Sequence, residues 1–331
     1  MDPLLRVDSL SVEYTTEEGV AKAVQDVSLD LRKGETLGIV GESGSGKSTL
    51  GLAVMGLIPT AGRITSGQIL FDGADLRQMN GEALRDLRGE RIAMIFQDPM
   101  TSLNPVKKIG DHFIEYIRAH DPEMNKEKAK SLTEGVLTDL GIPAARFNDY
   151  PHQFSGGMRQ RVMIGLALTL NPSLIIADEP TTALDVIVEA QILKLLADLK
   201  AKYSLSLILI THNMGIVAEM ADRVAVMYAG RMAEVGPTTT IFQSPKHPYT
   251  QALLESIPNI LVEDRKLATI PGSPPSLIEP PAGCPFHPRC PYVFDKCKAE
   301  VPLLVKTGNE SEASCFLLEG SMPRHSLKSK A

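Results

Sequence analysis

Hydrophobic and polar residues alternate near the N-terminus. In residues 4–33, apolar side chains recur at alternating positions on either side of a polar segment at Glu17-Glu18-Gly19. A period of two is typical of strands with one buried face, so we expect two strands joined at that turn. Gln68–Phe71, followed by Asp72-Gly73, predicts a further strand that enters a hairpin turn. We expect these strands to form an antiparallel β subdomain.

Three later segments are apolar throughout, namely Thr36–Val40, Leu174–Ala177 and Leu205–Ile210. Continuous apolar runs of this length are typical of strands covered on both faces, as in a parallel sheet. Helical stretches separate them, at Arg159–Leu170 and Val186–Lys200. This alternation of strand and helix predicts an α/β core.

Two further regions differ from this pattern. Residues 98–153 show helical periodicity, at Ile109–Ala119 and Lys126–Leu140, without a buried-strand run, and predict a helical insertion over about 98–160. After about residue 236 the composition changes, because twelve of the 23 prolines lie between Pro237 and Pro291. We therefore expect residues 237–331 to form an irregular C-terminal extension.

Composition narrows the possible functions. The 331 residues are 43% hydrophobic and 22% charged, as in globular proteins, and the net charge of −6 provides no electrostatic reason to expect a nucleic-acid partner. No apolar run reaches the length of about eighteen residues that a spanning helix needs. The N-terminus lacks a secretion signal. We expect the protein to stay where it is made and to contact a membrane only through a partner.

A phosphate-binding loop follows the first continuous apolar run. It fits the G-x-x-x-x-G-K-S pattern between a strand and a helix, where backbone N–H groups surround phosphates. Lys47 is expected to reach the β- and γ-phosphates, and the Ser48 hydroxyl to bind Mg²⁺. The expected nucleotide contacts are Gly41, Glu42, Ser43, Gly44, Ser45, Gly46, Lys47, Ser48 and the adjoining Thr49.

Two carboxylates end the second continuous apolar run. Asp178 is expected to hold Mg²⁺ through water, because an aspartate at the end of a buried strand does so in phosphoryl-transfer sites. Glu179 points the other way along the pleat, and we expect it to polarise the attacking water as a general base.

The chain resembles the ATP-binding cassette (ABC) family in its order of motifs. Phe154–Met158 is similar to the family signature L-S-G-G-Q and opens a helix, although Met158 departs from the usual glutamine. The resemblance implies that Ser155, Gly156 and Gly157 complete the ATP site of a second subunit in a head-to-tail dimer. Asp185, in Ala183-Leu184-Asp185, resembles the segment that links the two sites across that dimer.

Three single residues also match the family, and the resemblance covers about residues 4–236. Gln97 resembles the glutamine that senses Mg²⁺ and the attacking water, and His212 resembles the histidine that contacts the γ-phosphate. Tyr14 resembles the aromatic residue that stacks on adenine. The resemblance implies that residues 1–236 form an ABC nucleotide-binding domain, with ATP and Mg²⁺ as cofactors.

The extension indicates one branch of the family. Pro245–Leu254 and Cys284–Pro291 are similar to segments in ATPase subunits of the oligopeptide and dipeptide importers, whose relatives also import nickel chelates and opines. This implies an ATP-hydrolysing subunit that powers import of peptides or related small solutes. A second ATPase subunit (a homologous chain or a second copy), two transmembrane permease subunits and a periplasmic or extracellular substrate-binding protein are the implied partners. The implied location is the cytoplasmic face of the inner membrane.

Two other functions are open at this point. One is a soluble ABC ATPase that acts on ribosomes or DNA, but such chains usually carry two cassettes or an inserted coiled coil. The other is an exporter ATPase, which the cysteine-containing extension disfavours.

The cysteines lie in the extension at C-x5-C-x6-C-x17-C spacing, without the C-x2-C pairs of common zinc modules. They are Cys284, Cys290, Cys297 and Cys315. Four thiolates suit an iron–sulfur cluster or tetrahedral zinc, and unliganded reduced thiols are a third possibility. Because some members of this branch hold a [4Fe–4S] cluster there, the resemblance favours a structural cluster.

Overall fold

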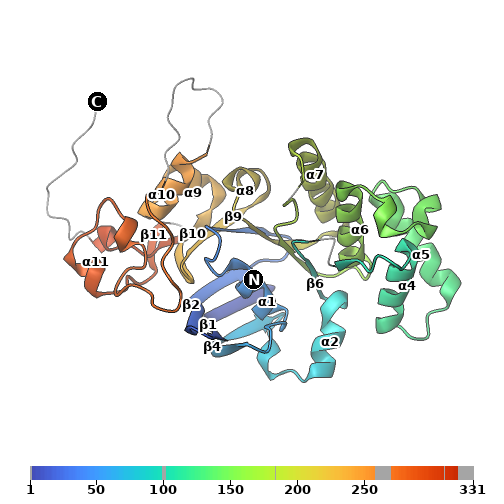
Figure 1. The fold of residues 1–331 in the computed structure, drawn as a ribbon, viewed down its shortest axis with the longest axis horizontal. Helices are drawn as coiled ribbons and strands as arrows, with labels where there is room; N and C mark the ends of the chain where they lie inside the picture. Colours follow the sequence, from blue (N-terminus) through green and yellow to red (C-terminus); the bar gives the residue numbers. More distant parts are fainter. Residues whose placement is uncertain (1, 99–101, 183, 258–269, 309, 320–331) are drawn as a thin grey trace.

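Two β-sheets organise the chain in the computed structural model, which describes residues 2–98, 102–182, 184–257, 270–308 and 310–319 (Figure 1). The smaller sheet has the order β2-β1-β4-β5 and is antiparallel, as the alternation near the N-terminus predicts. Its strands are β1 (Leu5–Thr16), β2 (Gly19–Leu31), β4 (Gly62–Phe71) and β5 (Ala74–Asp75). Parts of the predicted insertion (99–101) and extension (258–269, 309 and 320–331) lie outside the described residues.

The larger sheet has the order β11-β12-β10-β9-β3-β8-β7-β6. Its strands from β9 to β6 are parallel, whereas β10, β12 and β11 are antiparallel to their neighbours. The strands are β3 (Thr36–Val40), β6 (Ile92–Ile95), β7 (Leu174–Asp178), β8 (Ser206–Thr211), β9 (Arg223–Tyr228), β10 (Arg231–Pro237), β11 (Val305–Gly308) and β12 (Ser311–Ala313). The three continuous apolar runs are therefore β3, β7 and β8, and the predicted α/β core is confirmed.

Both faces of the parallel strands are covered. Along β7, Leu174 and Ile176 belong to one core cluster, which also contains residues of the antiparallel sheet and of α1 (Lys47–Val54). Ile175 and Ala177 belong to a second cluster on the opposite face. Successive side chains of a strand point to opposite faces, so a strand buried between two layers has to be apolar at every position.

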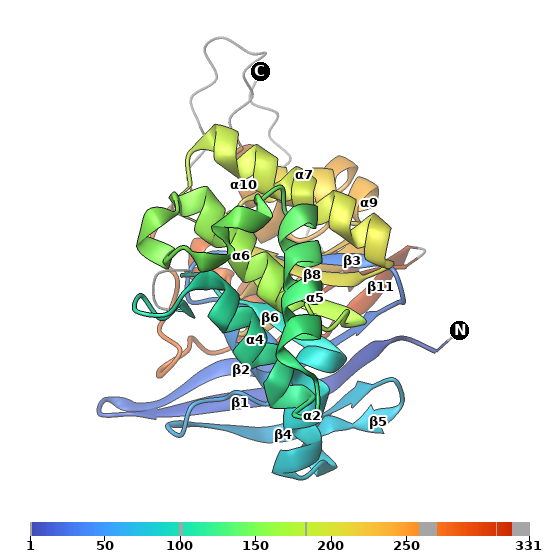
Figure 2. The same cartoon turned by 90° about the vertical axis from the view of Figure 1, so that its right-hand side faces the viewer.

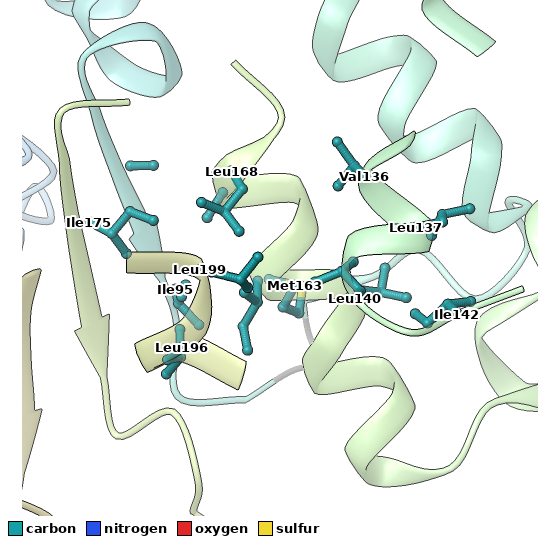
Figure 3. Close-up of a cluster of buried hydrophobic side chains, with 14 of the residues drawn as sticks. Ile95, Val136, Leu137, Leu140, Ile142, Met163, Leu168, Ile175, Leu196 and Leu199 are labelled. Carbon is teal, nitrogen blue, oxygen red and sulfur yellow. The ribbon is translucent and has the colours of Figure 1, made fainter. Parts of the chain in front are cut away.

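Helices of the insertion cover one end of the sheet (Figure 2). The insertion contains α4 (Ile109–His120) and α5 (Lys126–Asp139), and α6 (Gly156–Leu168) begins near its end. With α7 (Val186–Tyr203), which follows β7, these helices confirm the four that the sequence predicts. Figure 3 shows side chains of these helices, among them Leu168 of α6 and Leu196 and Leu199 of α7, in the cluster that includes Ile95 of β6 and Ile175 of β7. Each such side chain contributes about 1.5–3 kcal/mol when fully buried, so this cluster anchors the insertion to the sheet.

The extension contains more regular structure than its proline content indicates. Its strand β12 pairs with β10 at the antiparallel edge of the larger sheet. Tyr249 and Phe286 are buried against Tyr228 of β9. The helices of this region are α9 (Thr238–Gln243), α10 (Pro248–Glu255) and α11 (Asp295–Ala299). The described residues elsewhere also form α2 (Gly81–Glu90) and α8 (Met214–Met220). Within the described residues, no helix has the length and apolar character required to cross a bilayer.

Candidate functional site

The carboxyl ends of four neighbouring parallel strands bring the predicted residues of the site to one edge of the larger sheet. Gly41 follows β3, and Gln97 comes shortly after β6. Asp178 ends β7, and His212 follows β8. Parallel strands in register place these positions side by side, which is where ligands bind in open α/β sheets.

The phosphate loop fits closely between β9 and β2. Gly41 has φ 154° and Gly46 has φ 98°, values that L-residues with a side chain rarely adopt. A Cβ atom at Gly41 would lie 2.2 Å from the carbonyl oxygen of Met227, and one at Gly46 would lie 2.2 Å from that of Ala23. Both glycines are therefore required by the close approach of backbone as well as by φ.

Lys47 lies inside the loop with 5% of its surface exposed. Its Nζ atom donates to the carbonyl oxygens of Gly41 (2.8 Å) and Glu42 (2.9 Å). Burial lowers the pKa of Lys47, an effect that the nearby carboxylates of Glu179 and Asp178 only partly offset. A bound polyanion would supply the charge that this buried ammonium group lacks.

Asp178 and Ser48 form the candidate cation site. The Ser48 hydroxyl donates to Asp178 Oδ1 at 3.0 Å, and Asp178 has only 6% of its surface exposed. Burial raises the pKa of Asp178, and the neighbouring Glu179 acts in the same direction. A divalent cation beside the carboxylate would reverse that effect, and oxygen ligands of this kind suit Mg²⁺.

Glu179 is held by three side chains. Its carboxylate accepts hydrogen bonds from Thr182 Oγ1 (2.7 Å) and Gln97 Nε2 (3.3 Å), and it lies 3.2 Å from His212 Nδ1. Burial raises its pKa, but the hydrogen bonds from Thr182 and His212 outweigh burial and leave the pKa below its usual value. The carboxylate is therefore ionised at neutral pH and able to accept a proton. Thr182 was not among the predicted residues, although it lies one turn after Glu179.

Tyr14 lies beside the helix that follows the phosphate loop. Its hydroxyl is 3.5 Å from Thr49 Oγ1, at the limit of a hydrogen bond, and its ring is half-buried against Gly62. The structure thus brings Tyr14 next to Thr49, in the first turn of α1.

Ser155, Gly156 and Gly157 lie at the N-terminal end of α6. Ser155 is the N-cap of α6 and accepts a hydrogen bond from Met158 N, while Asp185 is the N-cap of α7. Among the described residues, no hydrogen bond or ion pair joins either cap to the phosphate loop. Ala183, in the predicted linking segment, lies outside the described residues.

Two residues of the extension that the sequence did not indicate also contact the loop. Arg289 pairs with the Glu42 carboxylate, and the Tyr249 hydroxyl accepts from Glu42 N. No motif spacing reveals contacts between positions more than 200 residues apart.

The four cysteines surround one small pocket with a volume of about 20 Å³. Burial raises the pKa of Cys284 to about 11 and that of Cys315 to about 12. All four are free thiols. Across the described ranges, no three His, Cys, Asp or Glu side chains are arranged as a metal site.

Comparison with known families matches two segments of the chain. Residues 24–182 match the ABC transporter family, and residues 233–297 match the family described as oligopeptide/dipeptide transporter, C-terminal region. The first match includes the phosphate loop and Glu179, and the second includes Tyr249 and three of the cysteines.

Individual relatives cover almost the whole chain. The dipeptide transport ATP-binding protein DppD of Bacillus subtilis is 47% identical over 96% of this chain and 95% of its own length. The oligopeptide transport ATP-binding protein OppD of Salmonella typhimurium is 49% identical over 91% and 90%. Among solved structures, a dimeric post-hydrolysis state of the ATP-binding cassette MJ0796 with ADP and Pi has a TM-score of 0.63 at 26% identity. It covers 71% of this chain and 98% of that one.

The buried carboxylate of Asp178 yields a prediction on stability. Since its pKa is raised in the folded state, the carboxylate destabilises the fold above pH about 3.8, and the penalty is complete above the folded-state pKa. Asp178→Asn retains an oxygen for the Ser48 hydroxyl and should raise the free energy of unfolding by about 0.5–2 kcal/mol at pH 7. Urea denaturation of both proteins without nucleotide or Mg²⁺, at pH 7 and below pH 4, measures this change in the free energy of unfolding. An equal gain at both pH values would contradict the assignment to charge.

Proposed function

The chain belongs to the ABC transporter family as an ATP-hydrolysing subunit, and from this premise we propose that it powers import of dipeptides or oligopeptides. The observation that carries the proposed ATPase site is the position of Glu179. It lies in contact with Gln97 and His212 beside the Ser48–Asp178 pair.

We assign residues 1–236 to the nucleotide-binding domain, with the insertion at about 98–160, and residues 237–331 to the extension.

In the proposed site, the backbone of Gly41–Ser48 surrounds the phosphates of ATP. Lys47 turns from the loop carbonyls to the β- and γ-phosphates, which restores the charge balance that burial disturbs. The Ser48 hydroxyl would hold Mg²⁺ directly and Asp178 would hold it through water, and the ion would offset negative charge on the phosphates. Tyr14 stacks on adenine, beside Thr49.

Glu179 is the proposed general base. Its carboxylate accepts a proton from a water molecule as that oxygen attacks the γ-phosphorus, and the bond to the β–γ bridging oxygen breaks. Gln97 and His212 orient the carboxylate and lie where they can sense the γ-phosphate. The low pKa of Glu179 keeps it ionised, but also limits its strength as a base.

A second ATPase subunit completes the site. Ser155 caps the N-terminus of α6, which begins at Gly156, and we propose that these N–H groups contact the ATP bound to the other subunit. Asp185 joins the two sites across the dimer. The dimeric structure of the related cassette MJ0796 with ADP and Pi supports a dimer, and the head-to-tail arrangement is the one that the resemblance implies.

Peptide import is supported by the extension and by the relatives. The match over residues 233–297 is to the C-terminal region of oligopeptide and dipeptide transporters, and DppD and OppD are named for transport of those solutes. We propose a peripheral position at the cytoplasmic face of the inner membrane, with two transmembrane permease subunits and a substrate-binding protein as partners. The relatives give no support to an ATPase acting on ribosomes or DNA.

For the extension we propose a [4Fe–4S] cluster on Cys284, Cys290, Cys297 and Cys315, with zinc as the alternative. The donors fit in kind and number, and a bound cation would favour the thiolates that burial disfavours. Among the described residues, the thiols are not arranged as a metal site. The pocket that the four cysteines line has a volume of about 20 Å³, which admits little more than one water.

Replacing Glu179 tests the ATPase mechanism. Glu179→Gln retains hydrogen bonding to Thr182 but removes the proton acceptor, so ATP binding should persist while hydrolysis falls about 10²–10⁴-fold. Nucleotide titration and phosphate release measure the two effects, with Glu219→Gln on the exposed surface of α8 as the control. Wild-type hydrolysis by Glu179→Gln would remove Glu179 from the role of base.

Metal analysis tests the cluster. Protein purified without oxygen should contain iron and acid-labile sulfide in equal amounts, with the absorbance of an iron–sulfur cluster, and Cys315→Ser should lower both. Stoichiometric zinc without sulfide would favour the alternative, and metal-free protein would reject both.

A further inference from the structure

The carboxylate of Glu42, the second residue of the phosphate loop, is paired with the C-terminal extension. Arg289 donates through both terminal nitrogens, at 2.7 Å to Glu42 Oε2 and 3.0 Å to Oε1. The side chain of Arg289 is 5% exposed and that of Glu42 is 26% exposed. A bidentate pair with so little solvent is much stronger than an exposed surface ion pair.

The guanidinium group of Arg289 is also held on its other sides. Its Nε donates to the carbonyl oxygen of Pro271 at 2.8 Å, and one terminal nitrogen donates to the Tyr228 hydroxyl at 3.1 Å. These contacts come from the extension and from β9, so Arg289 cannot leave Glu42 without losing several hydrogen bonds. The fork presented to the loop is therefore rigid.

The backbone of Glu42 is bound by the same region. Its N–H donates to the Tyr249 hydroxyl at 2.8 Å, and Tyr249 is fully buried. The ring centroids of Tyr249 and Tyr228 lie 4.5 Å apart, and the Tyr228 hydroxyl accepts a hydrogen bond from Arg289. The two partners of Glu42, Arg289 and Tyr249, therefore belong to one packed unit. The extension thus holds the side chain and the backbone of one residue in the loop.

This arrangement matters for an anionic ligand. Glu42 places a negative charge in the loop that is proposed to surround the phosphates of ATP, close enough to act on Lys47. Without a partner, that charge would repel the phosphates and compete with them for Lys47. Arg289 neutralises it and leaves Lys47 available.

We propose that Arg289 is a positioning residue of the nucleotide site, which neutralises Glu42 so that the phosphate loop accepts ATP. The proposal rests on the proposed function of Gly41–Ser48. It makes the cysteine-containing extension part of the ATP site, because Arg289 immediately precedes Cys290.

A double-mutant cycle on ATP affinity tests this role. Arg289→Met should weaken Mg·ATP binding about tenfold by leaving Glu42 unpaired. Glu42→Gln should then recover most of the loss in the Arg289→Met background, and have a much smaller effect in the wild-type background. Titration calorimetry under non-hydrolysing conditions measures all four proteins. Lys298→Met, at an exposed basic position of the same extension, is the control and should not change affinity.

The results separate an electrostatic role from simple anchoring of the extension. If Arg289 only anchors the extension, Glu42→Gln will not restore binding, and equal effects of Glu42→Gln in both backgrounds would overturn the proposal. Should Arg289→Met fail to fold, Arg289→Lys carries the test. It keeps the charge and should bind ATP within about threefold of wild type, and a larger loss would overturn the proposal. If wild type does not bind ATP, or Lys47→Ala binds equally well, the proposed function fails instead.

Discussion

Parallel pairing of β3, β7 and β8 holds the segments that follow these strands at one edge of the larger sheet. The candidate site consists of those segments together with Gln97, which comes after β6. Each strand is buried on both faces, so its register cannot shift by one residue without exchanging the residues of two cores. The distances between Ser48, Asp178 and Glu179 are therefore set by packing remote from the nucleotide.

The same burial gives the site its charge properties. It lowers the pKa of Lys47 and raises that of Asp178, so burial disfavours the charged form of each group. Phosphates and a divalent cation supply the missing charges. Glu179 differs, because Thr182 and His212 favour its ionised form. The ionised carboxylate of Glu179 thus lies beside two groups whose charged forms burial disfavours.

The sequence was informative where function depends on local order. The loop Gly41–Ser48, the pair Asp178-Glu179 and the apolar strands follow from spacing and periodicity within short segments. Thr182 could have been found from its position one turn after Glu179. The contact between Arg289 and Glu42 could not, since it depends on how the extension packs against β9. The proline content of the extension likewise concealed β12, which is stabilised by pairing with β10.

We propose that one ATP and one Mg²⁺ bind at this edge of the sheet. A crystal structure with Mg²⁺ and a non-hydrolysable ATP analogue tests this proposal. We expect the β- and γ-phosphates within hydrogen-bonding distance of Lys47, with Mg²⁺ bound to the Ser48 hydroxyl and facing Asp178. Phosphates bound away from Gly41–Ser48, or a cation without contact to Ser48, would contradict it.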